Sequence, residues 1–123
     1  MPSARGARGA AAETFAADAL RRDGYRILLR NHRTPAGELD IVALRRGVFA
    51  FVEVKARRPG GAAGTPEDAL TPAKLRRVQR AAEHVLRTRG LPDAPHVLLG
   101  AAVDLNTDGR PAAVRFLPVE IPR

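Results

Sequence analysis

Hydrophobic and polar positions alternate along the chain with two different periods, and the changes of period divide it into helices and strands. From Ala10 to Asp23 the apolar residues recur at helical spacing, and Gly24 is a natural stop. A second helix is predicted from about residue 72 to 89, because Thr71 is a suitable N-cap and a proline follows it. Strand-like patterns occupy five further stretches, namely 25–30, 39–44, 48–55, 96–105 and 110–119. The predicted order is α-β-β-β-α-β-β.

Several stretches fit neither period. Residues 1–9 are rich in Arg, Gly and Ala, and we expect a disordered basic arm there. Residues 31–37 indicate a turn, and the Gly and Pro of 57–65 indicate a flexible basic loop. A short helix start, Thr65-Pro66, follows that loop. With no internal repeat or linker visible, residues 10–120 are expected to form a single α/β domain.

Composition excludes several kinds of chemistry. The 123 residues contain no cysteine, which rules out disulfides, thiolate zinc sites and a Cys nucleophile. Ser3 is the only serine and lies in the N-terminal arm, so Ser-His-Asp catalysis is excluded as well. No apolar run approaches the roughly 20 residues that span a bilayer, and no signal-peptide stretch is present. We therefore expect a cytoplasmic protein with no membrane partner.

The charge indicates a partner. The net charge is +8, and a small basic domain commonly binds a polyanion such as nucleic acid. The alternative is that GC-rich coding inflates Arg and that the charge serves solubility. Of the 21 cationic side chains only Lys55 and Lys74 are lysines. Because the pKa of lysine can be tuned and that of arginine cannot, these two positions are candidates for a special role.

The candidate site lies in the hairpin formed by the second and third strands. Alternation within 48–55 places Glu53 and Lys55 on one face of the strand. Asp40 lies among apolar residues of the preceding strand, where an acid is costly without a partner. If Arg46-Gly47 is a two-residue turn, Asp40 is directly opposite Glu53. Two opposed carboxylates repel each other, and they need a proton or a cation between them.

These residue types predict metal-assisted chemistry on a phosphate. Oxygen ligands without Cys or His favour Mg²⁺ or Mn²⁺ over zinc. Asp40 and Glu53 would hold the metal, which polarises the scissile phosphate and activates a bound water. Lys55 would orient that water or stabilise the charge that builds on the phosphate. The alternative interpretation is a structural ion pair or triad of the same three side chains.

An ordered set of motifs carries a family resemblance. Gly37-Glu38-Leu39-Asp40 is followed by Phe51-Val52-Glu53-Val54-Lys55-Ala56-Arg57, with Asn31 and Arg33 before it and Thr-Pro-x-Lys, ending at Lys74, after it. This set resembles the YraN-like family of uncharacterised bacterial proteins. Those proteins are similar to archaeal Holliday-junction resolvases within the PD-(D/E)xK nuclease superfamily. The resemblance covers roughly residues 9–105.

The resemblance implies a fold and an activity. The fold would be a restriction-endonuclease-like core, with a mixed sheet of about five strands flanked by helices. The activity would be cleavage of DNA, including branched DNA, by a homodimer, since two symmetric cuts need two sites. The resemblance also implies that Glu13 is a further metal ligand; the alternative is a first-turn acid that favours the helix dipole. Two departures are Ala102-Val103-Asp104, where the family has Arg-Phe-Asp, and Leu75, where it has a polar residue.

Basic side chains near these motifs are candidates for phosphate contacts. We expect Arg57, Lys74 and Arg77 to bind the nucleic-acid backbone; the alternative for the cations of the second helix is a solvated helix face. The sequence thus predicts a metal-dependent DNA endonuclease. The alternatives are a non-catalytic nucleic-acid-binding protein that retains the fold, and a basic adaptor for an acidic protein.

Overall fold

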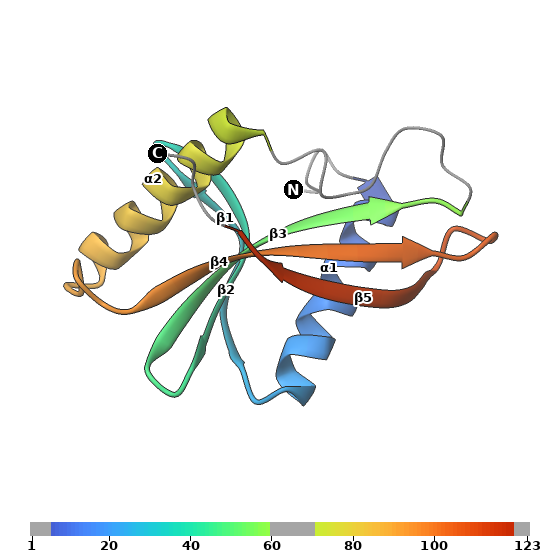
Figure 1. Cartoon of the computed structure of the whole chain (residues 1–123), viewed down its shortest axis with the longest axis horizontal. Coiled ribbons are helices and arrows are strands. Elements are labelled where there is room, and N and C mark those ends of the chain that lie inside the picture. Colours follow the sequence, from blue (N-terminus) through green and yellow to red (C-terminus); the bar gives the residue numbers. More distant parts are fainter. Residues whose placement is uncertain (1–5, 60–70, 120–123) are drawn as a thin grey trace.

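The computed structural model describes residues 6–59 and 71–119, in which a five-stranded sheet lies between two helices (Figure 1). The elements follow the predicted order α-β-β-β-α-β-β, and the mixed α/β fold is confirmed. Their bounds are α1 Gly6–Arg22, β1 Arg26–Thr34, β2 Gly37–Arg45, β3 Val48–Arg57, α2 Pro72–Thr88, β4 His96–Leu105 and β5 Pro111–Pro118. Neither helix in these ranges is long and apolar enough to cross a membrane.

Two of the predicted boundaries are wrong. Helix α1 begins at Gly6, so residues 6–9 are helical and not part of a disordered arm, while residues 1–5 lie outside the described residues. Alanine and arginine favour helix strongly enough to offset two glycines, which cost about 1 kcal/mol each. Strand β1 continues to Thr34, because pairing with β2 extends it through the stretch predicted as a turn. The predicted helix start at Thr65-Pro66 lies outside the described residues, as does most of the basic loop.

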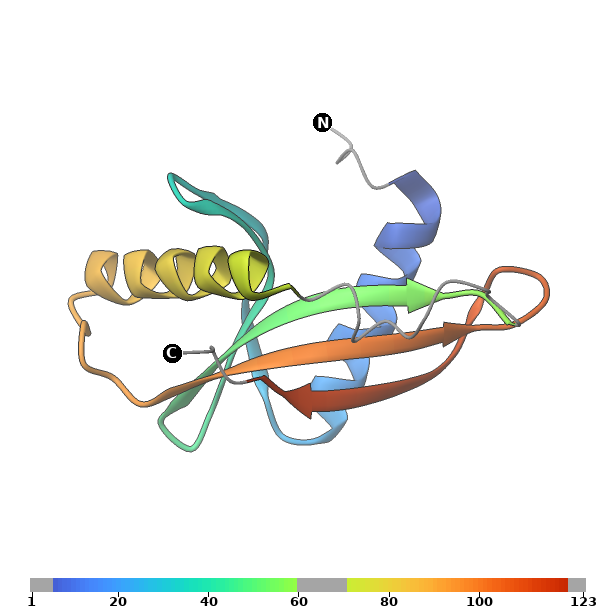
Figure 2. The ribbon, with the colours of Figure 1, turned by 45° about the horizontal axis from the view of Figure 1, so that its top comes forward.

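The strands lie in the order β1-β2-β3-β4-β5. Neighbouring strands are antiparallel except for β3 and β4, which are parallel. A parallel pair needs a long crossover connection, and α2 is its helical part. The ends of β3 and β4 therefore point in the same direction (Figures 1 and 2), and the candidate site on β3 lies beside the middle of β4, where Glu53 pairs with Gly100 and Lys55 with Ala102.

Each helix covers one face of the sheet (Figure 2). The buried side of α1 is made largely of alanine, and small side chains let the helix approach the sheet closely. On the other face, α2 packs a stripe of buried apolar residues against Phe49 and Phe51 of β3. The stripe consists of Leu75, Val78, Ala81, Ala82, Val85 and Leu86. The apolar part of β3 is covered on both faces. Its polar end, which contains Glu53 and Lys55, is partly exposed and can contact a ligand.

Candidate functional site

The β2–β3 hairpin has the predicted register but ends sooner than expected. Arg46 and Gly47 both have positive φ, of 52° and 79°, as a two-residue hairpin turn requires. The ladder runs from the pair Arg45–Val48 to the pair Ile41–Val52. Asp40 and Glu53, which would form the next pair, are not ladder partners, and the prediction of direct opposition is wrong in that respect.

The reason is a divergence of the strands at Asp40. Its Oδ2 accepts the backbone N–H of Val54 at 2.7 Å, so a carboxylate supplies the acceptor for this N–H. Leu39 packs on the α2 side and Ile41 on the α1 side, although alternate residues of a regular strand share a face. On the neighbouring strand Asn31 has a φ of 51°. The distortion buries Asp40 to 3% exposure and aims its carboxylate at β3.

The three predicted catalytic residues are brought together. Asp40, Glu53 and Lys55 line one cavity of about 270 Å³. Its remaining walls come from the first half of α1 and from the end of β3, and consist of Gly9, Ala12, Val54 and Ala56. The cavity thus lies where the covering helix α1 meets the polar end of the strand.

Burial and charge oppose each other at Glu53 and Lys55. Burial raises the pKa of the Glu53 carboxyl above its ordinary value, and the charge of Asp40 raises it further, while Lys74 and Lys55 act in the opposite direction. Burial lowers the pKa of the Lys55 ammonium, and the neighbouring Lys74 lowers it further. Burial and the charge of Asp40 thus disfavour the ionised form of Glu53. A bound cation would offset both effects, and the site therefore favours a cation.

Lys74 lies closer to the site than the sequence indicated. Its Nζ is 3.1 Å from Oε1 of Glu53, whose side chain is 13% exposed. The position of Lys74 in the first turn of α2 is fixed by the N-cap Thr71, whose Oγ1 accepts the Lys74 backbone N–H at 3.2 Å. Sequence reasoning assigned Lys74 to phosphate and missed this pair, although the scarcity of lysine had singled the residue out. Glu53 therefore lies between two lysines, one on its own strand and one on α2.

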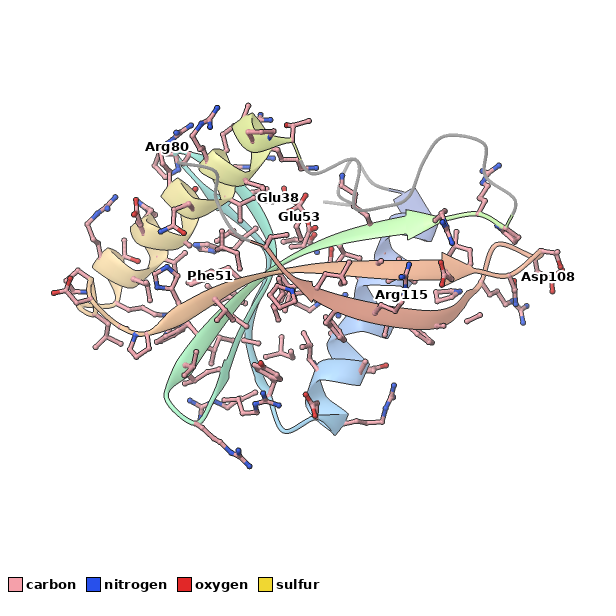
Figure 3. The ribbon with its side chains drawn as sticks, viewed as in Figure 1. Glu38, Phe51, Glu53, Arg80, Asp108 and Arg115 are labelled. Atoms are coloured by element: carbon pink, nitrogen blue, oxygen red, sulfur yellow. The ribbon has the colours of Figure 1, made fainter. Side chains whose placement is uncertain are left out.

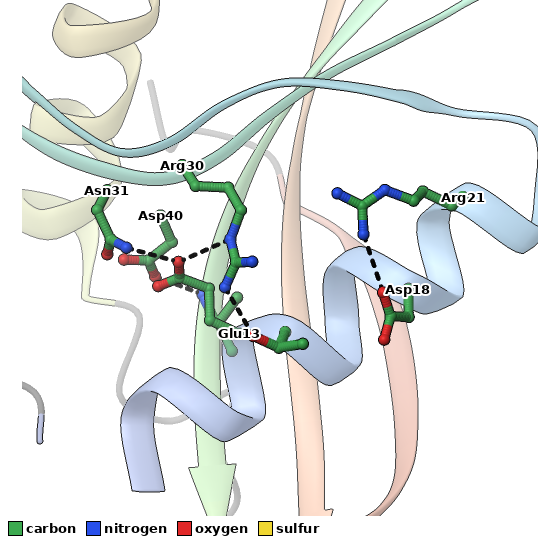
Figure 4. Close-up of polar contacts among 8 residues, drawn as sticks. Glu13, Asp18, Arg21, Arg30, Asn31 and Asp40 are labelled. Atoms are coloured by element: carbon green, nitrogen blue, oxygen red, sulfur yellow. Dashed lines mark hydrogen bonds and ion pairs between the residues drawn. The ribbon is translucent and has the colours of Figure 1, made fainter. Parts of the chain in front are cut away.

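Glu13 is fully buried and has partners that the sequence did not reveal (Figure 4). Its Oε1 accepts from Nε of Arg30 at 3.2 Å and from Nδ2 of Asn31 at 2.9 Å. Because α1 begins at Gly6, Glu13 is in the helix interior, and the alternative of a first-turn acid is wrong. The signal that could have revealed these partners is that any buried acid needs one.

The donor set can be compared with the requirements of a metal ion. Within residues 6–59 and 71–119, no three or more His, Cys, Asp and Glu side chains form a group that could hold a metal. Mg²⁺ commonly needs fewer, since one or two carboxylates, water and substrate phosphate complete its shell. Asp40 and Glu53 fit that pattern, because they line one cavity and supply hard oxygen donors. Glu13 already accepts hydrogen bonds from Arg30 and Asn31.

The other predicted phosphate-binding residues lie on two sides of the site. Arg57 is at the end of β3, where its Nη2 is 3.5 Å from Oδ1 of Asp104 on the parallel strand β4. Arg77 lines a second cavity of about 260 Å³, which it shares with Lys74 and Glu53. Figure 3 shows Glu38 and Glu53 close together beside α2 at this point. Arg77 is therefore near Glu38 and Glu53, whereas Arg57 lies two residues beyond Lys55 on β3.

Comparison with known proteins gives a family but no activity. A family model described as "Uncharacterised protein family UPF0102" matches residues 12–116, which include every candidate site residue. A UPF0102 protein of Symbiobacterium thermophilum is 44% identical over 102 residues, covering 83% of this chain and 86% of the relative. Another, from Rhodopseudomonas palustris strain BisB5, is 44% identical over 114 residues, covering 93% and 79%. A third, from Syntrophotalea carbinolica, is 52% identical over 79 residues, covering 64% and 63%.

Proposed function

This chain belongs to the uncharacterised protein family UPF0102, whose name assigns no activity, and we propose from its site that it is a metal-dependent nuclease acting on DNA phosphodiesters. The resemblance to the YraN-like family is confirmed by this membership, whereas the activity rests on the site alone. The observation that carries the proposal is the convergence of Asp40, Glu53 and Lys55 on one cavity of a strongly basic protein. The proposed setting is the cytoplasm, and the proposed assembly is a homodimer that cuts both strands of branched DNA.

The chain's own residues would share the work as follows. Asp40, oriented by the Val54 N–H, and Glu53, oriented by Lys74, would hold Mg²⁺ or Mn²⁺. The bound cation would supply Lewis acidity toward the phosphate and toward a water molecule. Lys55 would stabilise the negative charge that builds on the phosphate oxygens. Glu13, whose Oε1 is held by Arg30 and Asn31, would be a further ligand.

A second candidate function is nucleic-acid binding without catalysis. It is favoured by one observation, namely that two of the acids already have cationic partners within the protein. Lys74 pairs with Glu53 and Arg30 pairs with Glu13, so the acids of this region are partly neutralised by the chain itself. In that case the same basic surface would bind DNA, and the acids would serve stability.

Cleavage assays with matched variants separate these functions. Supercoiled, single-stranded and four-way-junction DNA would be incubated with the protein in Mg²⁺ or Mn²⁺. Asp40→Asn preserves side-chain size and removes the charge, and Asp18→Asn makes the same change on the exposed side of α1. We expect cleavage by the wild type and by Asp18→Asn, and its loss in Asp40→Asn. DNA binding without cleavage in all three proteins would overturn the nuclease proposal in favour of the binding function.

A further inference from the structure

Glu53 lines two cavities. The first contains Asp40 and Lys55, as described above. The second, of about 260 Å³, lies between the beginning of α2 and the turn that joins β1 to β2. Its lining residues are Ala36, Gly37, Glu38, Glu53, Lys74 and Arg77. Because a single side chain belongs to both linings, the two cavities are neighbours that meet at Glu53.

Two acids and two cations line the second cavity, and a third cation, Arg33, pairs with one of these acids from outside the lining. Glu53 pairs with Lys74 at 3.1 Å, and Glu38 pairs with Arg33, whose Nη2 is 3.7 Å away. Arg77 is exposed and forms no ion pair with any residue of the described ranges. The cavity therefore retains the positive charge of Arg77, which favours an anion as its occupant.

Both walls of this cavity are held in place by the chain itself. On one side, Oγ1 of Thr34 donates to the carbonyl oxygen of Gly37 at 2.7 Å and accepts the N–H groups of Ala36 and Gly37 at 3.1 and 3.2 Å. Gly37 has a φ of 142°, which side chains rarely tolerate. On the other side, Lys74 and Arg77 are three residues apart on α2 and so lie on one face of the helix. A binding site with fixed walls loses little entropy when it is filled.

We infer that the second cavity binds the phosphate next to the scissile one on the same strand, with Arg77 as its cation. This inference rests on the proposed nuclease function, which assigns the reacting phosphodiester to the first cavity. Arginine suits the task because its planar guanidinium can donate two parallel hydrogen bonds to phosphate oxygens. A strand that fills both cavities passes over Glu53. The preferred substrate is thus a continuous strand with a phosphate on this side of the cut, and not a terminal nucleotide.

Methylphosphonate substitution tests the assignment. On a DNA substrate whose cleavage position has been mapped, one linkage at a time beside the cut is replaced by an uncharged methylphosphonate. In the wild type, neutralising the linkage that occupies the second cavity should lower kcat/KM about tenfold. In Arg77→Ala the same replacement should have almost no further effect, because the cation that reads this charge is absent. Arg87→Ala, a matched change in the exposed last turn of α2, should retain the full penalty.

A binding measurement without metal provides a second readout. In a chelator, the slope of log Kd against log salt concentration should fall by about one in Arg77→Ala, as expected for the loss of one phosphate contact. A methylphosphonate penalty in Arg77→Ala equal to that of the wild type would overturn the inference and leave the nuclease proposal standing. Absence of cleavage by the wild type would overturn the nuclease proposal, and the assignment of a neighbouring phosphate would fall with it.

Discussion

At the scale of single residues, the site is defined by acids that are buried before any ligand arrives. Glu53 is nearly buried, lies within the electrostatic influence of Asp40, and is offset by Lys55 and Lys74. The net result is a raised pKa, so the folded protein holds the Glu53 proton more tightly than the unfolded chain does. This imbalance has a measurable consequence for stability.

The contribution of Glu53 to the free energy of unfolding should fall as pH rises from the ordinary range of glutamate through the raised pKa. Glu53→Gln does not titrate, so its stability relative to the wild type should increase across the same window. Urea denaturation in a chelator at a series of pH values measures the difference. Glu83→Gln, an exposed change on α2, is the control. A relative stability of Glu53→Gln that stays flat or falls with pH would contradict this account.

Arg30 should be worth more to stability than its exposure suggests. Arg30→Met removes the cationic partner of the fully buried Glu13 and is expected to cost about 2 kcal/mol, because a buried carboxylate loses a charged hydrogen-bond donor. Arg21→Met is a matched control, since Arg21 and Asp18 on the same helix are both 51% exposed and should contribute under about 0.5 kcal/mol. Equal losses of stability in the two variants, measured by chemical denaturation, would show that the buried Glu13–Arg30 pair contributes no more than the exposed Asp18–Arg21 pair.

At the scale of elements, local patterns predict the helices, the strands and their order. Gly24 and Gly90 mark the ends of the two helices, and the turn residues Arg46-Gly47 are enough to predict the β2–β3 register correctly. The divergence at Asp40 could not be predicted, because it depends on a bent neighbouring strand and on the Val54 N–H of a third. For the same reason the Glu13–Arg30 and Glu53–Lys74 pairs were missed: each joins two different elements, and local patterns do not show how those elements pack against each other.

Asn31 tests whether β1 supports the distortion at Asp40. Its φ of 51° is tolerated by asparagine and glycine but costs other residues about 1–2 kcal/mol. Asn31→Ala should therefore destabilise the fold through both backbone strain and loss of the bond to Glu13. Asn31→Gly keeps the backbone conformation and loses only the bond, so it should be the less damaging change. Thermal and urea denaturation of both variants give the comparison, and a more stable Asn31→Ala would contradict the role given to this residue.

At the scale of the whole molecule, the three site acids and the arginines of α2 are separated by burial. Glu13, Asp40 and Glu53 are turned inward, whereas many of the arginines of α2 lie in solvent (Figure 3). The exposed arginines of that helix are Arg76, Arg77, Arg80 and Arg87. The surface is consequently more basic than a net charge of +8 alone indicates. Such a protein attracts a polyanion to its surface while its interior acids favour a cation, which is the combination that metal-assisted phosphodiester chemistry needs.

This separation predicts that divalent cations stabilise the fold. A cation that binds only the folded protein raises the free energy of unfolding by about 2.7 kcal/mol at one hundred times its Kd. Mg²⁺ or Mn²⁺ should therefore raise the Tm of the wild type above that in NaCl of equal ionic strength. The increase should disappear in Asp40→Asn and in Glu53→Gln, and should persist in Asp18→Asn, whose carboxylate is exposed on α1. If all four proteins respond alike, the cations act on the surface, and Asp40 and Glu53 do not form a metal site.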